Sequence, residues 1–404
     1  MFPPLNEQMD VIKRGASEII PEDDFVKKLQ RAIKTKKPLR VKLGCDPSRP
    51  DLHLGHSVVL RKLRQFQDLG HEAILIIGDF TGMIGDPSGR SKTRPSLSLE
   101  ETRQNGQSYF EQATKILSSK KIQMFYNSEW LAKMNFADVI RLASKYTVAR
   151  MLERDDFTQR YKAGEPISVH EFLYPLAQAM DSVAIEADIE LGGTDQKFNL
   201  LVGRDIQREY SLEPQVILTT PILVGTDGVE KMSKSLDNYI GINESAKEIY
   251  GKTLRIPDEQ IYSYFELTTD VTNKELADIK KDLAEKTSNP RDIKRRLART
   301  LVTMYHDEKA ATRAEEEFDR IFKDKALPDE VEEYRLDSQS GPKSIIDLLT
   351  TTELAASKSE ARRLIDQGGV SIDSERVPDA NAPLPDKNEF VLKVGKRKFL
   401  KIVR

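Results

Sequence analysis

The chain of 404 residues is longer than one hydrophobic core usually supports, so we expect two or three domains. Its net charge of -2 gives no global sign of nucleic-acid binding, and its single cysteine, Cys45, excludes an internal disulfide and a multi-cysteine zinc site. The N-terminus lacks the apolar stretch of a secretory signal, and the densest apolar run is too short to cross a bilayer, which predicts a cytoplasmic protein without a membrane span.

The first 240 residues alternate helix and strand patterns. Residues 21–33 have the apolar period of an amphipathic helix, and residues 39–43 alternate apolar and basic side chains as a strand does. A loop rich in Gly, Asp and Pro leads to a helix over residues 57–69 and to an apolar strand over residues 73–77, buried on both faces. Later patterns predict helices over residues 98–119 and 136–153 and a strand over residues 214–224. This order predicts an α/β catalytic domain of Rossmann-like type, with a parallel sheet, over residues 1–240.

After residue 240 the composition becomes charged and favours helices. Prolines interrupt this stretch, which we interpret as a helical domain over residues 241–335. The Ser, Gly and Pro of residues 338–342 predict a linker. The remaining residues, 343–404, predict a small α+β unit.

The motif His53-Leu54-Gly55-His56 lies between the first of these strands and the helix that follows it. The free N–H groups and the dipole of a helix N-terminus attract phosphate. The two imidazoles are three residues apart and share one helix face, while Gly55 leaves room for an adenine. The alternative is a pair of histidines that only cap the helix. We interpret the motif as part of an ATP site.

A second motif, Lys231-Met232-Ser233-Lys234-Ser235, follows a Gly- and Asp-containing turn and so lies on a loop. Its two lysines and two hydroxyls would form a cationic clamp suited to a triphosphate. Lysine-rich loops are more often only solvated surface, so this motif is suggestive by itself.

A third pattern is the polar stripe of Tyr174, Gln178 and Asp181 in a largely apolar segment. Spacings of four and three residues place these side chains on one face of a helix. A polar stripe is also typical of a solvated helix face, but the apolar residues around this one favour a binding surface.

Together these motifs resemble those of the class I aminoacyl-tRNA synthetases, and the stripe resembles the pocket helix of their tyrosyl-tRNA synthetase family, of bacterial type. The resemblance implies activation of L-tyrosine with ATP, release of pyrophosphate, and transfer of the tyrosyl group to the 3'-terminal adenosine of tRNA(Tyr). It implies that the catalytic residues are His53, His56, Lys231 and Lys234. It also implies that ATP, with Mg²⁺ bound to it and no metal bound by the protein, contacts Gly44, Asp46, His53, Gly55, His56, Gly193, Asp195, Lys231, Ser233, Lys234 and Ser235.

The same resemblance assigns the tyrosine pocket. Asp181 would accept a hydrogen bond from the phenol, and Tyr174 and Gln178 would hold the α-amino group. The residues implied to bind tyrosine are Thr81, Asp86, Tyr174, Gln178, Asp181 and Gln196. One position departs from the usual pattern: Lys42 stands where many members carry a second phenol-binding tyrosine, as in the second bacterial subfamily, and we assign Lys42 no such role.

The C-terminal unit resembles the RNA-binding domain shared with a small-subunit ribosomal protein, the S-four fold. The residues implied to contact tRNA are Arg90 and Arg94 of the catalytic domain and, in this unit, Arg362, Arg363, Lys396, Arg397 and Lys398. The family also implies a homodimer formed through an insertion at about residues 124–165. That insertion offers the apolar side chains of Phe136, Val139, Ile140, Leu142, Tyr146 and Met151, which would otherwise fill the core of the monomer.

Three alternatives remain open. A nucleotidyltransferase such as a cytidylyltransferase would share the histidine motif but would lack the pocket helix and the RNA-binding unit. A tryptophanyl-tRNA synthetase would share the fold, and indole N–H also needs an acceptor, so Asp181 alone does not decide the substrate. A non-catalytic RNA-binding relative would typically lose the histidine or the lysine motif, and both are intact.

Overall fold

The computed structural model describes residues 2–47, 51–86, 99–322, 332–336, 342, 344–373, 375–380, 382–395 and 398–404. The chain divides into two compact units, Met1–Ala311 and Thr312–Arg404. Within the described ranges, no helix is both long and apolar enough to cross a membrane.

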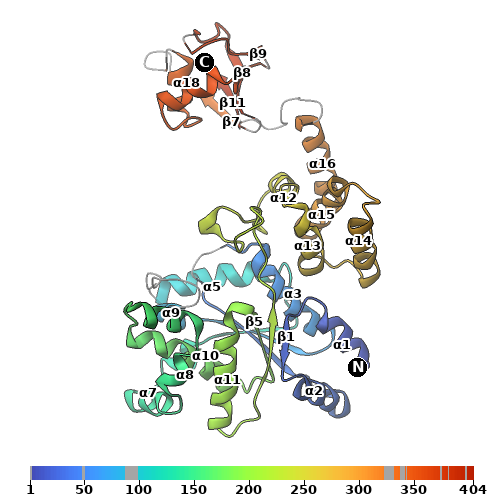
Figure 1. Ribbon diagram of the computed structural model, residues 1–404, viewed down its shortest axis with the longest axis vertical. Coiled ribbons are helices and arrows are strands. Elements are labelled where there is room, and N and C mark those ends of the chain that lie inside the picture. The colour runs from blue at the N-terminus through green and yellow to red at the C-terminus, as the bar shows by residue number, and fades with distance from the viewer. Residues whose placement is uncertain are drawn as a thin grey trace. The chain divides into compact units, whose positions relative to one another are not determined.

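A six-stranded sheet forms the centre of the first unit, in the order β1-β6-β5-β2-β3-β4. Two of its strands, β1 and β5, are labelled in Figure 1. All neighbours run parallel except β1, which pairs antiparallel with β6. The predicted parallel sheet is confirmed, and β1 is an edge strand of three residues that the sequence pattern did not indicate. The strands are β1 (Glu18–Ile20), β2 (Arg40–Cys45), β3 (Glu72–Ile77), β4 (Ile122–Tyr126), β5 (Ile189–Gly193) and β6 (Val216–Thr220).

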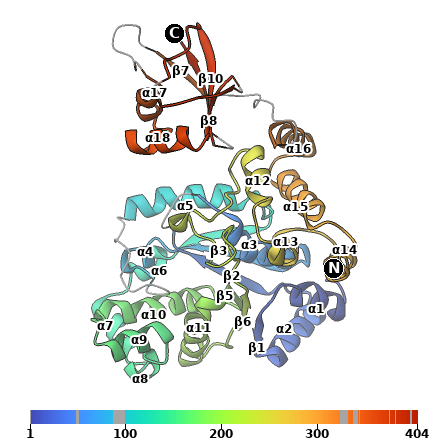
Figure 2. The same cartoon turned by 45° about the horizontal axis from the view of Figure 1, so that its top comes forward.

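Helices cover both faces of this sheet, as expected for strands whose residues are buried on both sides. In Figure 2, α3 (Leu54–Asp68) and α5 (Leu99–Ala113) lie on one face, and α10 (Val169–Ala184) and α11 (Lys197–Glu209) lie on the other. The N-terminal helices and the short helix after β3 are α1 (Leu5–Lys13), α2 (Glu22–Thr35) and α4 (Thr81–Ile84).

An insertion of short helices lies between β4 and α10. The single helix predicted over residues 136–153 is wrong: Asn135 caps α7 (Phe136–Ala143), and Thr147 caps a separate helix, α8 (Val148–Met151). Each cap accepts a backbone N–H and so starts a new helix. The insertion also begins later than predicted, because residues up to Tyr126 belong to β4. Its other helices are α6 (Ser128–Leu131) and α9 (Asp155–Ala163).

The strand order reverses beside β2. The chain leaves β2 through α3 to reach β3 on one side, while β5 pairs with the other side of β2. In open α/β sheets, ligands bind in the crevice beyond the carboxyl ends of the strands at such a point. The loops after β2 and β5 are therefore where a site is expected.

A helical region follows β6 within the same unit and packs against α3. The Tyr264 hydroxyl donates to the Val224 carbonyl at 2.7 Å, and Gly241 forms a bridge with His53. The predicted run of helices is confirmed. It consists of α12 (Ala246–Thr253), α13 (Ile261–Thr268), α14 (Asn273–Glu285), α15 (Pro290–Tyr305) and α16 (Glu308–Phe322), in the last of which the first unit ends.

Among the residues that the structure describes after α16, the C-terminal unit contains a five-stranded sheet in the order β7-β11-β10-β8-β9, two helices and its own apolar core. Strand β7 (Glu332–Arg335) pairs parallel with β11, so these residues belong to this sheet and not to the helical domain predicted to end at residue 335. Most of the predicted linker, residues 338–342, lies outside the described residues. The other elements are α17 (Ile345–Thr351), α18 (Lys358–Asp366), β8 (Val370–Ile372), β9 (Glu375–Arg376), β10 (Glu389–Val394) and β11 (Lys398–Val403).

Candidate active site

A cavity of about 330 Å³ opens at the carboxyl ends of β2 and β5, where the strand order reverses. The structure brings most of the predicted ATP and tyrosine residues into its lining: Gly44, Asp46, His53, Gly55, His56, Thr81, Asp86, Tyr174, Gln178, Asp181, Gly193, Asp195, Gln196, Lys231 and Ser233. Lys234 and Ser235 do not line it. These residues come from six separate segments of the first unit, so one cavity collects patterns that are far apart in the sequence.

The histidine motif forms the beginning of α3. The Gly55 N–H donates to His53 Nδ1 at 3.1 Å, and the His53 N–H donates to His56 Nδ1 at 3.3 Å. Burial lowers the pKa of His53 to about 2, which leaves the ring neutral at pH 7. A Cβ on Gly55 would lie 2.9 Å from the His53 ring, so glycine is needed here for the packing of the motif itself. Capping and ligand binding are thus compatible roles.

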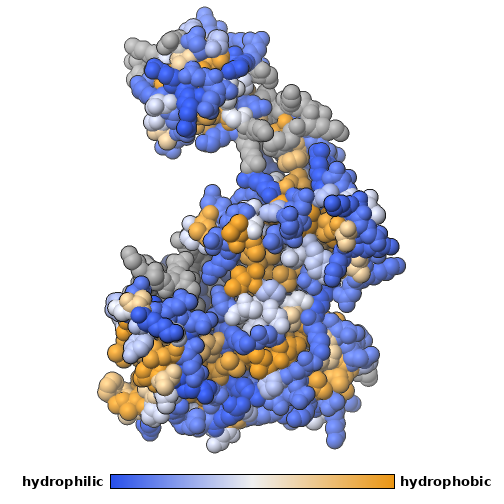
Figure 3. Space-filling model, viewed as in Figure 1, coloured by the Kyte–Doolittle hydropathy of each residue, from blue (hydrophilic) through white to orange (hydrophobic). Residues whose placement is uncertain are grey.

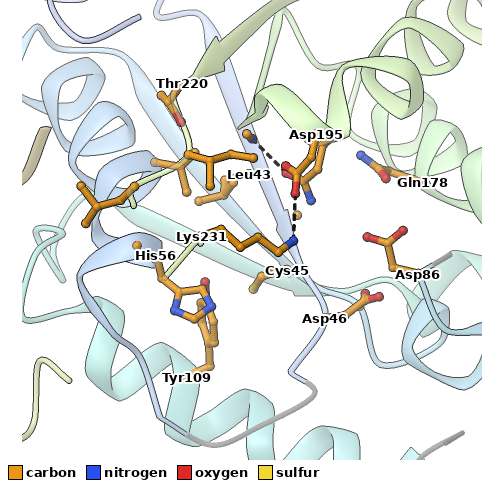
Figure 4. A pocket seen from close by; sticks show the side chains of 18 of the residues that line it. Leu43, Cys45, Asp46, His56, Asp86, Tyr109, Gln178, Asp195, Thr220 and Lys231 are labelled. Atoms are coloured by element: carbon orange, nitrogen blue, oxygen red, sulfur yellow. Dashed lines mark hydrogen bonds and ion pairs between the residues drawn. The ribbon is translucent and has the colours of Figure 1, made fainter. Parts of the chain in front are cut away.

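The lysine loop is anchored at its base and places its two cations differently. The Ser233 N–H donates to Asn238 Oδ1 at 2.7 Å, and the backbone of Lys231 forms an antiparallel β-bridge with Val224. Lys231 Nζ lies 3.6 Å from Asp195 Oδ2 across the cavity (Figure 4). Lys234 Nζ instead lies 2.7 Å from Asp51 Oδ2, outside the cavity lining. Each lysine therefore pairs with a carboxylate that a phosphate could replace.

Asp46 connects the residues predicted to bind ATP with those predicted to bind tyrosine. Its carboxylate accepts a hydrogen bond from the Tyr174 hydroxyl at 2.8 Å and another from the Thr81 hydroxyl at 2.7 Å. The sequence placed Asp46 with ATP and the other two residues with tyrosine. In the structure all three meet between β2, α4 and α10. The polar groups for the two substrates are therefore continuous.

Asp181 provides a buried acceptor in the lining of the cavity. Its carboxylate accepts from Trp130 Nε1 at 2.9 Å and from Asn127 Nδ2 at 3.4 Å. Burial raises its pKa to about 7, against the opposing effect of the Lys42 charge. The sequence analysis missed Asn127 and Trp130, because they follow β4 in a segment without a recognisable pattern.

Lys42 does not line the cavity. Its side chain is fully buried, and Nζ donates to Ser182 Oγ at 2.7 Å and pairs with Glu190 Oε1 at 2.9 Å. Lys42 therefore contacts residues outside the cavity lining and does not face the cavity. The residues of the lining to which the sequence analysis gave no role in the site are mostly small or apolar: Leu43, Cys45, Val59, Ile76, Gly78, Tyr109, Thr220, Pro221, Ile222, Leu223 and Met232.

Comparison with known proteins decides the family. A sequence model described as tRNA synthetases class I (W and Y) matches residues 34–323, and one described as Tyrosine--tRNA ligase SYY-like C-terminal domain matches residues 324–402. The tyrosine–tRNA ligase of Salinibacter ruber is 58% identical over 404 residues, covering 99% of this chain and 97% of the relative. The chain belongs to the tyrosine–tRNA ligase family. The family member of Carboxydothermus hydrogenoformans is 55% identical over 403 residues, 99% of this chain and 98% of that relative.

Solved structures of tyrosine–tRNA ligases share the fold. The crystal structure of tyrosyl-tRNA synthetase from Archaeoglobus fulgidus superposes with a TM-score of 0.64 at 24% identity, covering 76% of this chain and 99% of that one. The truncated mitochondrial enzyme of Aspergillus nidulans gives 0.63 at 22% identity, covering 79% and 94%. The predicted α/β fold class is confirmed by these neighbours and by the parallel sheet.

The residues that the ligase family implied for tRNA fall into two groups. Arg362 and Arg363 lie exposed on α18, and Lys398 is exposed at the start of β11. Arg90, Arg94, Lys396 and Arg397 lie outside the described residues. The three described basic side chains of this set are therefore exposed on the C-terminal unit.

Proposed function

We propose that this chain is a tyrosine–tRNA ligase that activates L-tyrosine with ATP and transfers the tyrosyl group to the 3'-terminal adenosine of tRNA(Tyr). One observation carries the chemistry: a single cavity is lined by a buried carboxylate, Asp181, and also by His53 and His56 with Lys231. The carboxylate suits a phenol, and the helix N-terminus with its lysine suits a triphosphate. The cytoplasm, where tRNA charging supplies translation, is part of the proposal.

The proposed mechanism needs no covalent intermediate with the protein. The substrate carboxylate attacks the α-phosphorus of ATP, and pyrophosphate leaves. The polar groups of the cavity hold the two reactants in line, and the lysine loop meets the charge that develops on the leaving group. Asp195 holds the ribose once Lys231 leaves it for phosphate. Gln196 holds the carboxyl group of the amino acid, and Asp86 holds its α-amino group.

Mg²⁺ enters this proposal as part of the ATP substrate. Across the described residues, no group of three or more His, Cys, Asp or Glu side chains is arranged to hold a metal ion. The lysine loop would meet the proposed phosphates, which suits a triphosphate that already carries its metal.

ATP–pyrophosphate exchange with tyrosine, tryptophan and phenylalanine in parallel tests the proposal. We expect exchange with tyrosine alone. Exchange with tryptophan and not tyrosine would assign the chain to the other branch of its family, and no exchange with any of the three would leave it a non-catalytic relative.

The insertion carries exposed apolar side chains that favour a homodimer. Orange surface gathers over α7 to α10 in Figure 3. Phe136 is 80% exposed and Ile140 is 54% exposed, whereas Leu142 and Met151 fill the core of the monomer. The apolar residues named from the sequence therefore divide between both roles. The exposed side chains of this face are Phe136, Ile140, Val148, Tyr161 and Val169.

We expect a mass of twice 45.9 kDa by light scattering at micromolar concentration. Phe136→Glu places a charge in the proposed interface and should shift the protein to the monomer without unfolding it, because the side chain is exposed. Val229→Glu, at an equally exposed valine of the lysine loop, is the matched control and should remain dimeric. A wild-type protein that is monomeric would contradict the dimer.

Charging of tRNA should depend on the C-terminal unit, while activation should not. Because β7 belongs to the C-terminal sheet, the cut belongs before it, and residues 1–323 form the truncated chain. We expect this chain to fold and to catalyse tyrosine-dependent exchange at close to the full rate, but to charge tRNA poorly. Binding of tRNA by the full chain should weaken steeply with salt, and the truncated chain should show a shallower slope.

The double substitution Arg362→Ala with Arg363→Ala tests the same surface without a truncation. If full charging persists in both the truncated chain and the double variant, the C-terminal unit is not the tRNA anchor. If the truncated chain folds but has lost pyrophosphate exchange, the two units are not functionally separable.

A further inference from the structure

Two opposite charges are buried face to face in the middle of the sheet. Lys42 of β2 and Glu190 of β5 occupy paired positions on neighbouring parallel strands, and both side chains are at most 1% exposed. Lys42 Nζ uses its three donors on Glu190 Oε1, Ser182 Oγ and the Gln178 carbonyl. Apolar side chains at these positions would serve the core equally well. An ion pair here therefore calls for a role other than stability.

Glu190 is hydrogen-bonded to the pocket helix, α10. Its carboxylate accepts hydrogen bonds from Gln178 Nε2 at 2.9 Å and from Ser182 Oγ at 3.1 Å, both on α10, and also from Gln215 Nε2. Gln178 lines the cavity. The side-chain amide of Gln178 is thus tied by its nitrogen to a group that can only accept.

The side-chain oxygen of Gln178 also has a fixed partner. Gln178 Oε1 accepts from Asn199 Nδ2 at 3.1 Å, and Asn199 Oδ1 accepts from Arg154 Nη1 at 3.1 Å. Arg154 can only donate, and its guanidinium also lies 3.5 Å from Asp86, another residue of the cavity lining. The two amides therefore lie between an acceptor-only carboxylate and a donor-only guanidinium.

This arrangement permits one orientation for each amide. Turning the Gln178 amide over would set Oε1 against the Glu190 carboxylate and Nε2 against the N–H of Asn199. In the permitted orientation Oε1 keeps one lone pair free for a donor. A substrate ammonium needs such an acceptor, and the reversed amide would offer it an N–H instead.

We propose that Lys42 and Glu190 are positioning residues that, through the chain Glu190–Gln178–Asn199–Arg154, orient the Gln178 amide to receive the α-ammonium group of the amino-acid substrate. This inference rests on the proposed tyrosine site. It gives the lysine at the departing position a function: Lys42 pairs with Glu190 inside the sheet and holds its carboxylate beside the Gln178 amide. Neither residue touches the substrate.

Tyrosine and 3-(4-hydroxyphenyl)propanoate, which is tyrosine without its ammonium group, distinguish positioning from a general structural role. Both compounds carry the phenol and the carboxylate. Glu190→Leu removes the acceptor, so that nothing on this side fixes which end of the Gln178 amide faces Glu190's position. By titration calorimetry, we expect the affinity for tyrosine to fall about tenfold or more and the affinity for the analogue to stay within about twofold.

The double variant Lys42→Met with Glu190→Leu answers the same question without a buried unpaired charge. Replacing a buried ion pair by apolar side chains of similar size usually preserves the fold, so this variant should remain folded and show the same selective loss of tyrosine affinity. Gln67→Leu is the matched control: Gln67 is a fully buried polar residue of α3 that donates to the Ser118 and Lys121 carbonyls, away from Glu190 and its partners. It should change the two affinities equally or not at all.

Equal losses for tyrosine and the analogue in both variants, or no loss in either, would overturn the positioning role. Failure of the wild-type protein to bind tyrosine at all would instead overturn the proposed function. The two failures are therefore distinguishable in one set of titrations.

Discussion

Lys234→Ala should lower the rate of tyrosyl-adenylate formation by about 10²-fold or more, with little change in tyrosine affinity. In the structure Lys234 pairs with Asp51 outside the cavity, so it contributes nothing to the ground-state tyrosine pocket. During attack, charge builds on the leaving pyrophosphate, and a lysine on a loop can exchange its carboxylate partner for that charge. The loss should therefore appear in the rate and not in tyrosine binding.

Single-turnover adenylate formation, followed by quenching, measures this rate directly. Lys247→Ala, at an exposed lysine near the start of α12, is the control and should behave as wild type. Asp51→Ala frees Lys234 without removing it and should leave the rate within a few fold. A Lys234→Ala protein with a normal rate would show that the pair with Asp51 is only a surface contact.

Asp181→Ala should lower kcat/KM for tyrosine by about 10²-fold and reduce activation of phenylalanine far less. A site built around a buried acceptor rejects an analogue that cannot donate to it, an effect for which tyrosyl-tRNA synthetases are themselves the standard example. Here Trp130 and Asn127 already donate to the carboxylate, so the substrate phenol would complete its set of donors. Parallel exchange assays with both amino acids measure the change, and equal losses would make Asp181 structural.

The raised pKa of Asp181, about 7, adds a pH signature to the same prediction. A phenol donates best to the ionised carboxylate, so tyrosine affinity should rise with pH and level off above the pKa. Between pH 6 and pH 8 the ionised fraction changes about tenfold, and the dissociation constant should fall by about the same factor. Asp181→Asn cannot ionise and should show a flat profile over this range.

The sequence predicted those parts of the site whose functional residues lie close together in the chain. His53 to His56, Lys231 to Ser235 and the stripe on α10 each keep their spacing when the chain folds, so their types and intervals were sufficient. The reversal of strand order at β2 then brings them together, and the alternation of helices and strands had already implied a sheet of that kind. The resemblance supplied the roles.

The remainder depends on contacts between distant segments. Asn127 and Trp130 reach Asp181 only because the insertion folds back beside α10, and no periodicity marks them. Glu190 had a signal that was overlooked: a single acid inside an apolar strand, matched by Lys42 inside another. Isolated opposite charges in two buried strands indicate a pair, but only the observed register shows that they face each other.

The central position of β2 has a consequence for how the nascent chain matures. Its pairing with β3 closes a short loop through α3, whereas its pairing with β5 must wait for more than a hundred intervening residues. Contacts so distant in sequence form late, so the histidine motif can be in place well before the pocket helix is docked. A partly folded chain then lacks the substrate contacts proposed for the residues of β5 and α10. Ligand-dependent thermal stabilisation would accordingly report only those molecules whose sheet is complete.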